Sequence, residues 1–246
     1  MIKIKTQDEI RKIDQSGRIA AFALKQVANN VRIGITTFEL DQIAKRIIIA
    51  RGATPSFLDY QGYQNSTCIS VNDELVHGIP GSKKINQGDI VKIDLGVFYN
   101  GYHTDTAITV VVGKLSDDIK RLVHGTKEAL MSTIKQVKPG IRVGDIEHYC
   151  GQILRSHNLG AVTALSGHGI GTELHEEPAI RCDGKVDTGA KIKEGMVFAL
   201  EPMATLGAPE VHTKRDNWTV VTNDHSMAAH FEHTIVITKN GAKILT

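Results

Sequence analysis

The sequence predicts an α+β fold in which two similar halves, about residues 1–112 and 113–246, share one curved antiparallel sheet with helices on its outer face. A repeated turn predicts the halves, because residues 31–35 (VRIGI) resemble residues 137–141 (VKPGI). A repeated strand supports them, since residues 88–94 and 195–201 both begin with glycine, continue as apolar runs and end in an acid. Matches in the same order indicate an internal repeat within a single domain, residues 1–246.

Each half is predicted to begin with two helices. Thr6 with Glu9, and Thr36 with Glu39, have the spacing of capping boxes, which places two of the helix starts. The four predicted helices cover about residues 6–31, 37–51, 116–137 and 143–157.

Glycines mark the expected end of each second helix. Gly52 and Gly160 follow these helices, where a left-handed residue commonly ends a helix. The strands that follow contain another repeat, because residues 77–79 and 168–170 both read HGI. Each half therefore has the order α-α-β-β, and we expect an approximate twofold relation with the site in the concavity of the sheet.

One hairpin is predicted to bring two acids to the same face of the sheet. Asn100-Gly101 is the pair that two-residue type I′ turns prefer. With that turn, Asp94 lies opposite residue 107, and Asp105 becomes its diagonal neighbour at about 7–8 Å or less. Because side chains alternate along a strand, both acids point to one face. We interpret them as metal ligands.

Three more donor residues lie in apolar or Gly-rich segments. His168 has a glycine on each side, Glu201 ends an apolar run, and Glu232 lies within another. A buried acid must be paired, protonated or bound to a metal. Four carboxylates and one imidazole suit a pair of Mn²⁺, Fe²⁺, Co²⁺ or Zn²⁺ ions. Paired ions about 3.5–4 Å apart activate water, so the sequence predicts a metal-dependent hydrolase.

Bulk composition argues against several other classes. Net charge is only +2 and no Lys/Arg block is present, so we expect no specific nucleic-acid partner. The apolar runs are too short to span a bilayer, and the N-terminus lacks the apolar core of a signal peptide. We therefore expect a cytoplasmic protein. Its three cysteines are widely spaced, which argues against a disulfide framework.

Seven motifs carry a resemblance over nearly the whole chain. They are residues 77–80 (HGIP), 92–94 (KID), 101–106 (GYHTDT), 167–171 (GHGIG), 174–178 (LHEEP), 200–203 (LEPM) and 232–234 (EHT). In this order they resemble type I methionine aminopeptidase in its short, bacterial form. The resemblance implies the pita-bread fold, which agrees with the internal repeat.

The resemblance also implies an activity and a ligand set. Such an enzyme removes the initiator methionine from nascent proteins whose second residue is small. Two divalent ions (Co, Mn, Fe, Zn or Ni) would activate the attacking water. Asp94 would bind one ion, and His168 with Glu201 the other, while Asp105 and Glu232 would bridge them.

Three residues receive catalytic roles from the same resemblance. Glu201 would carry the proton of the attacking water. His175 would hydrogen-bond the scissile carbonyl or stabilise the oxyanion. His77 would position the peptide and serve the leaving amine.

The resemblance further implies a pocket for the methionine side chain. Soft and aromatic side chains suit a thioether sulfur. The implied lining residues are Tyr60, Tyr63, Cys68 and Trp218. From their spacing alone, ordinary core packing is the simpler reading. Leu174 stands where relatives often carry an aromatic residue, and Phe57 where some carry a small residue or cysteine, so the pocket outline stays open.

Other functions remain as alternatives. Prolidase and aminopeptidase P share much of the metal set but usually carry an additional N-terminal domain. Type II methionine aminopeptidases carry a long helical insertion that this sequence does not show. Pita-bread proteins without catalysis bind peptides, RNA or histones, and others cleave creatine-like amidines. For the leading hypothesis, we expect a monomer that makes a transient ribosome contact and acts on nascent N-termini.

Overall fold

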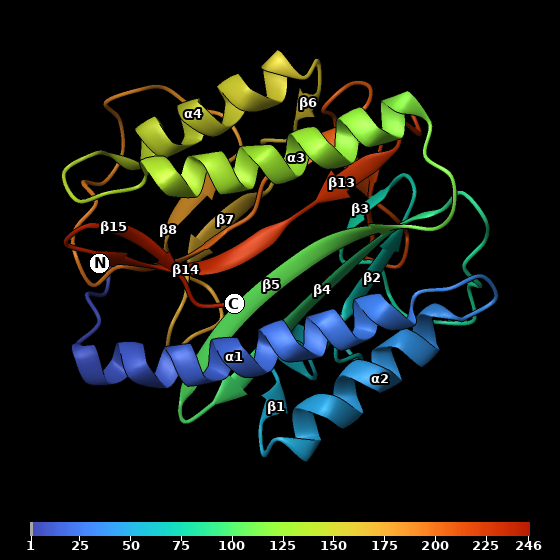
Figure 1. Cartoon of the computed structure of the whole chain (residues 1–246), viewed down its shortest axis with the longest axis horizontal. Coiled ribbons are helices and arrows are strands. Elements are labelled where there is room, and N and C mark those ends of the chain that lie inside the picture. The colour runs from blue at the N-terminus through green and yellow to red at the C-terminus, as the bar shows by residue number, and fades with distance from the viewer. Residues whose placement is uncertain (1) are drawn as a thin grey trace.

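The computed structural model describes residues 2–246, in which four helices lie on one face of a curved antiparallel sheet (Figure 1). The first helix pair lies over one half of the sheet and the second pair over the other. The helices are α1 (Gln7–Asn30), α2 (Thr37–Ala50), α3 (Asp117–Gln136) and α4 (Val143–Ser156). Within residues 2–246, every helix is too short or too polar to cross a membrane.

Nine strands form the main sheet, and two small three-stranded sheets flank it. Along the main sheet the order is β1 (Thr54–Pro55), β4 (Ile90–Tyr99), β5 (Tyr102–Val111), β14 (Glu232–Thr238), β9 (Val197–Leu200), β7 (Ser166–Gly169) and β8 (Glu176–Arg181), with β2 (Cys68–Val71) beside β4 and β15 (Gly241–Ile244) beside β14. The small sheets join β13 (Ala228–His230), β10 (Met203–Thr205) and β6 (Gly160–Ala161), and β11 (Val211–Thr213), β12 (Val220–Thr222) and β3 (Glu74–Val76). These small sheets were not predicted, because each of their strands has only two or three residues.

The predicted helix starts are confirmed. The side chains of Thr6 and Thr36 each accept a hydrogen bond from the backbone amide of the glutamate three residues later, and the carboxylate of each glutamate accepts one from the backbone amide of the threonine. The reciprocal pairs satisfy amide groups that the first helical turn leaves without partners.

The two halves repeat at the level of single backbone contacts. Thr36 bridges Lys84 in the first half, and Arg142 bridges Lys191 in the second. Both bridges tie the start of the second helix to the loop that precedes a central strand of the sheet, which is β4 in one half and β9 in the other. The internal repeat is therefore confirmed in the structure.

The predicted hairpin is also confirmed. Asn100 and Gly101 both have positive φ, 52° and 84°, as a type I′ turn requires. Asp94 pairs with Ala107, and Asp105 pairs with the residue two positions beyond Asp94. Ile93 and Leu95 pack with α1 and α2 in one hydrophobic cluster, so alternation turns Asp94 to the opposite, concave face.

Two details of the predicted repeat are wrong. Asp94 does not end its strand, since β4 continues to Tyr99, whereas Glu201 does follow the last residue of β9. His168 lies within β7, but its sequence counterpart His77 lies just after β3 in a left-handed conformation with φ 57°.

The prediction for the end of α4 is wrong as well. Gly52 has the expected positive φ of 69°, but Gly160 does not, and Asn158 supplies the left-handed residue instead. A Cβ at position 160 would collide with Thr205 Oγ1 on the neighbouring strand. Close strand packing explains that glycine.

Replacing Gly101 by alanine tests the turn that sets the register of the two acids. The position is open, so the cost comes only from the positive φ and is expected to be about 1–2 kcal/mol of unfolding free energy. Gly81→Ala is the matched control: it too has open space, without a positive φ, and its expected cost is within about 0.5 kcal/mol. Urea unfolding of both variants measures the difference, and equal costs would contradict the turn assignment.

Candidate metal centre and substrate pocket

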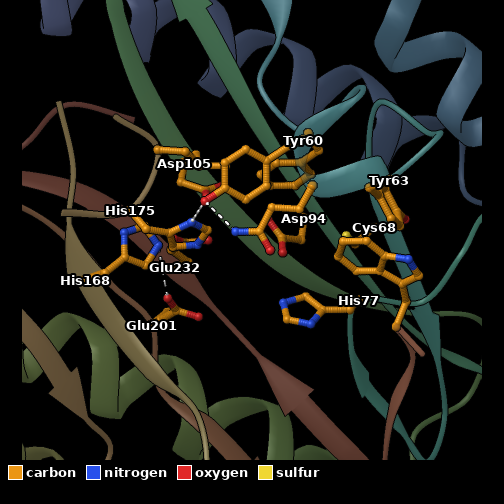
Figure 2. A pocket seen from close by; sticks show the side chains of 14 residues that line it. Tyr60, Tyr63, Cys68, His77, Asp94, Asp105, His168, His175, Glu201 and Glu232 are labelled. Carbon is orange, nitrogen blue, oxygen red and sulfur yellow. Dashed lines mark hydrogen bonds and ion pairs between the residues drawn. The ribbon is translucent and has the colours of Figure 1, made fainter. Parts of the chain in front are cut away.

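One cavity on the concave side of the sheet brings all the predicted site residues together. It is lined by Phe57, Tyr60, Gln61, Tyr63, Cys68, His77, Asp94, Asp105, His168, Leu174, His175, Glu201, Trp218 and Glu232. Figure 2 shows His168, His175 and Glu201 on one side and Tyr63 and Cys68 on the other, with Asp94 between them. The cavity therefore has an acidic part beside a partly apolar part.

The acidic part is assembled from strands of both halves. Asp94 and Asp105 come from the β4–β5 hairpin, Glu232 from β14, His168 from β7 and Glu201 from the end of β9. The pairing of β5 with β14 joins the halves and sets Glu232 opposite Ala107. Residues distant in sequence thus meet through strand register.

Donor atoms in this part lie at metal-binding separations. Asp105, His168 and Glu232 each offer one atom, and these three atoms lie within 4.8 Å of one another. His168 Nε2 lies 3.7 Å from Oε1 of Glu201. Asp94 lies opposite Cys68 on the neighbouring strand and also lines the cavity.

A backbone contact selects the nitrogen that His168 can offer. Its Nδ1 lies 2.9 Å from the carbonyl oxygen of Gly169. A carbonyl can only accept, so Nδ1 carries the hydrogen and donates it. Nε2 is then free as a metal ligand, which is the usual way a ligating imidazole is oriented.

Burial and mutual repulsion disfavour the ionised acids. Burial raises the pKa of Asp94, Glu201 and Glu232 well above the usual values, and the charge of Asp105 raises each further. Burial likewise raises the pKa of Asp105 to about 7. Oδ1 of Asp94 is buried without a hydrogen-bond partner. Divalent cations would neutralise this set and pair that oxygen, so the residues fit a metal site.

Two histidines face the same cavity as neutral imidazoles. Burial lowers the pKa of His77 to about 4, and burial also lowers the pKa of His175. Nδ1 of His175 lies 2.7 Å from the hydroxyl of Tyr60, and its ring centre is 4.2 Å from that of His168. A neutral imidazole with one fixed nitrogen can use the other toward a ligand.

The apolar part has an aromatic wall with one thiol. Tyr63 and Trp218 meet edge-on with ring centres 4.9 Å apart, and the Tyr63 hydroxyl donates to backbone carbonyls of Thr67 and Gly78. Burial raises the pKa of Cys68, which keeps the thiol neutral. Phe57 and Leu174 also line the cavity, so both departures from the motif pattern shape it directly.

His230 is the neighbour of the site that sequence reasoning missed. It is buried in β13, and its Nε2 lies 3.3 Å from Oε2 of Glu201, whereas His168 lies near the other oxygen, Oε1. It follows an Ala-Ala pair and belongs to no motif, so only the path of β13 reveals it. Gln61 was missed too, and its amide contacts the Tyr60 hydroxyl at 3.4 Å.

Comparison with known proteins agrees with this geometry. The model of metallopeptidase family M24 matches residues 11–239. The chain belongs to metallopeptidase family M24. Members of a metallopeptidase family act with divalent metal ions, as the acidic part of the cavity requires.

Relatives of this M24 chain match along its full length. It is 46% identical to methionine aminopeptidase 1 of Bacillus subtilis, covering all of this chain and 99% of the relative. It is 40% identical to methionine aminopeptidase of Escherichia coli, covering all of this chain and 94% of the relative. The crystal structure of methionine aminopeptidase from Thermotoga maritima matches with a TM-score of 0.98 at 43% identity, covering all of this chain and 99% of that one.

A second branch of the family matches less completely. Prolidase from Pyrococcus horikoshii matches with a TM-score of 0.78 at 28% identity, and the match covers 99% of this chain but 63% of the prolidase. Both branches have the pita-bread fold, so that fold prediction is confirmed.

The buried acids predict how pH affects the metal-stripped protein. Acids with raised pKa bind protons in the folded state that the unfolded chain, titrating near pH 4, has already lost. Unfolding free energy therefore falls as pH rises through the folded pKa values. The buried histidines, whose pKa values are lowered, work in the opposite direction only below about pH 6.5.

We therefore expect the unfolding free energy of metal-stripped protein to fall between about pH 6.5 and 8, by up to about 1.4 kcal/mol per pH unit for each titrating group, and its melting temperature to fall with it. Asp105→Asn removes one such group and flattens the slope. Thermal unfolding in chelator measures both, and a rise in stability over this range would contradict the assignment of the raised pKa values.

Proposed function

We propose that this chain removes the N-terminal methionine from polypeptides whose second residue is small, using divalent metal ions. The observation that carries the proposal is the single cavity in which five donor side chains stand beside an aromatic, thiol-containing pocket. The full-length relatives named methionine aminopeptidase support the same activity.

We assign the metal ligands by residue. Asp94 would hold one ion, His168 and Glu201 a second, and Asp105 with Glu232 would bridge the pair. When bound, the ions polarise the scissile carbonyl and lower the pKa of the attacking water. Their identity would be Co, Mn, Fe, Zn or Ni, since carboxylates with one imidazole accept all of these.

The side chains of the chain then move the protons. Glu201 would take a proton from the attacking water, because its carboxylate would lie beside that water. Neutral His175 would donate from Nε2 to the carbonyl oxygen as negative charge develops, in the tautomer whose Nδ1 accepts from Tyr60. His77 would orient the peptide and serve the leaving amine across the cavity.

The apolar part of the cavity would take the methionine side chain. Tyr60, Tyr63, Cys68 and Trp218 present aromatic faces and a neutral thiol, which suit a polarisable thioether. Leu174 closes the same wall with an aliphatic side chain.

We propose a cellular setting consistent with this activity. The natural substrates would be nascent chains in the cytoplasm, met during a transient ribosome contact. The protein would act as a monomer whose residues 1–246 form one catalytic domain.

A peptide assay separates the candidate activities. Chelator-stripped protein is incubated with Met-Ala-Ser, Met-Leu-Ser and Ala-Pro-Ala, with and without Mn²⁺, and products are identified by mass spectrometry. We expect free methionine from Met-Ala-Ser only after metal is restored, and little from Met-Leu-Ser. Cleavage of Ala-Pro-Ala instead would assign the chain to the proline-directed branch, and no cleavage despite bound metal would favour a binding role.

Two substitutions test the assigned roles. Asp105→Ala removes a bridging ligand and is expected to abolish turnover, whereas His175→Ala is expected to lower kcat by roughly 10²–10³-fold through loss of one oxyanion donor. Calorimetric metal titration is the accompanying measurement, with His175→Ala binding normally and Asp105→Ala binding weakly. Full turnover by Asp105→Ala would contradict the bridging role, and a change confined to KM would contradict the oxyanion role of His175.

A further inference from the structure

A buried ion pair lies behind the cavity wall that carries His175. The Nζ of Lys5 contacts Oε2 of Glu176 at 2.5 Å, and the two side chains are only 4% and 5% exposed. The pair joins the segment before α1 to the first residue of β8, 171 residues later in the chain. Burying such charges costs free energy unless they are paired and hydrogen-bonded. Removing one partner of the pair is therefore expected to destabilise the folded protein strongly.

The backbone around the pair leaves space for the side chain of Lys5. Its amide donates to the carbonyl of Gly195 at 2.8 Å, which fixes the segment before α1 against the turn that leads into β9. A Cβ on Gly171 would lie 2.6 Å from Cε of Lys5 and 2.9 Å from Oε1 of Glu176. A side chain at position 171 would therefore displace the lysine.

The other oxygen of Glu176 closes the loop that leads to the site. Oε1 accepts hydrogen bonds from the backbone amides of Thr172 and Glu173 at 3.0 and 3.4 Å. Leu174, on the cavity wall, lies within the closed loop. Although burial opposes ionisation, the hydrogen bond and charge of Lys5 hold the pKa of Glu176 below its usual value, so the acceptor stays charged.

Glu176 and His175 are adjacent in the sequence, yet their side chains contact different parts of the structure. His175 is the last residue of the bend before β8, and Glu176 is the first residue of that strand. The glutamate points to Lys5, whereas the histidine lines the cavity and meets Tyr60. Any shift of Glu176 therefore moves His175 through one peptide unit.

We propose that Lys5 is a positioning residue, which acts through Glu176 to fix His175 against the substrate carbonyl. This inference rests on the proposed aminopeptidase activity, and it adds to the reaction a residue from outside the cavity. Transition-state hydrogen bonds are sensitive to small displacements, so loosening His175 is expected to lower kcat more than it changes KM.

Lys5→Met tests the role by keeping the length of the side chain and removing its charge. We expect kcat to fall roughly ten- to a hundredfold, with metal affinity unchanged by calorimetry. Lys3→Met is the matched control. Lys3 contacts the same carboxylate at 3.3 Å but is 51% exposed, so water replaces its charge and kcat is expected to stay near the wild-type value.

A double-mutant cycle separates positioning from general stability. In the His175→Ala background, Lys5→Met has no imidazole left to misplace, so it is expected to lower kcat further by no more than about twofold. A purely structural role would give the same loss in both backgrounds, and that result would overturn the proposal. Unchanged kcat in Lys5→Met, or a change in KM alone, would overturn it as well.

Two further measurements keep the test independent of folding yield and of the activity. If Lys5→Met does not fold, Glu176→Gln weakens the same pair while keeping its shape, and the same cycle applies. Amide hydrogen exchange needs no substrate: exchange at Thr172 and Glu173 is expected to rise in Lys5→Met and not in Lys3→Met. Unchanged exchange would refute the contact itself, whereas faster exchange in a protein without aminopeptidase activity would refute only the proposed function.

Discussion

Four carboxylates buried in one cavity are the constraint on which the rest of the structure depends. Without cations, Asp94, Asp105, Glu201 and Glu232 repel one another and hold protons, as their raised pKa values show. Burying such a set of acids lowers the stability of the fold. Its presence therefore indicates that these residues are kept for function and not for stability. The surrounding structure supplies the stabilisation, since apolar clusters on the helix side of the sheet are built from residues that alternate with the acids along the same strands.

The sheet register converts this constraint into a defined geometry. The Asn100-Gly101 turn fixes β4 against β5, and a shift of one strand by one residue would turn one of the two aspartates to the helix face. The hydroxyl of Thr234 then accepts from the amide of Asp105 at 2.9 Å and donates to its carbonyl at 2.8 Å, which locks β5 to β14 at the junction of the halves. The proposed metal ligands on different strands are thereby held by backbone pairing, and rigid elements position a site more accurately than loops do.

Much of this could be predicted because the relevant signals are local. Capping boxes, the Asn-Gly turn and residue parity depend on neighbouring residues, so the helices and the placement of the two aspartates followed directly from the sequence. His230 could not be found in this way, because its contact with Glu201 depends on how β13 crosses the sheet. The same limit applies to Gly160. A glycine is needed there because a neighbouring strand leaves no room for a Cβ, and not because a helix ends there.

The broken repeat at the two histidines shows how similar halves acquire different chemistry. In β7, strand geometry lets His168 donate from Nδ1 to a backbone carbonyl and present Nε2 to the acids. His77 has the same sequence neighbours but a left-handed backbone, held by close packing of Gly78 against Ile69 and by the amide of Gly78, which donates to Ser70. That conformation turns its imidazole to the opposite side of the cavity (Figure 2). One tripeptide thus supplies the proposed metal ligand in one half and the proposed substrate-facing group in the other, and the difference lies in backbone conformation rather than residue type.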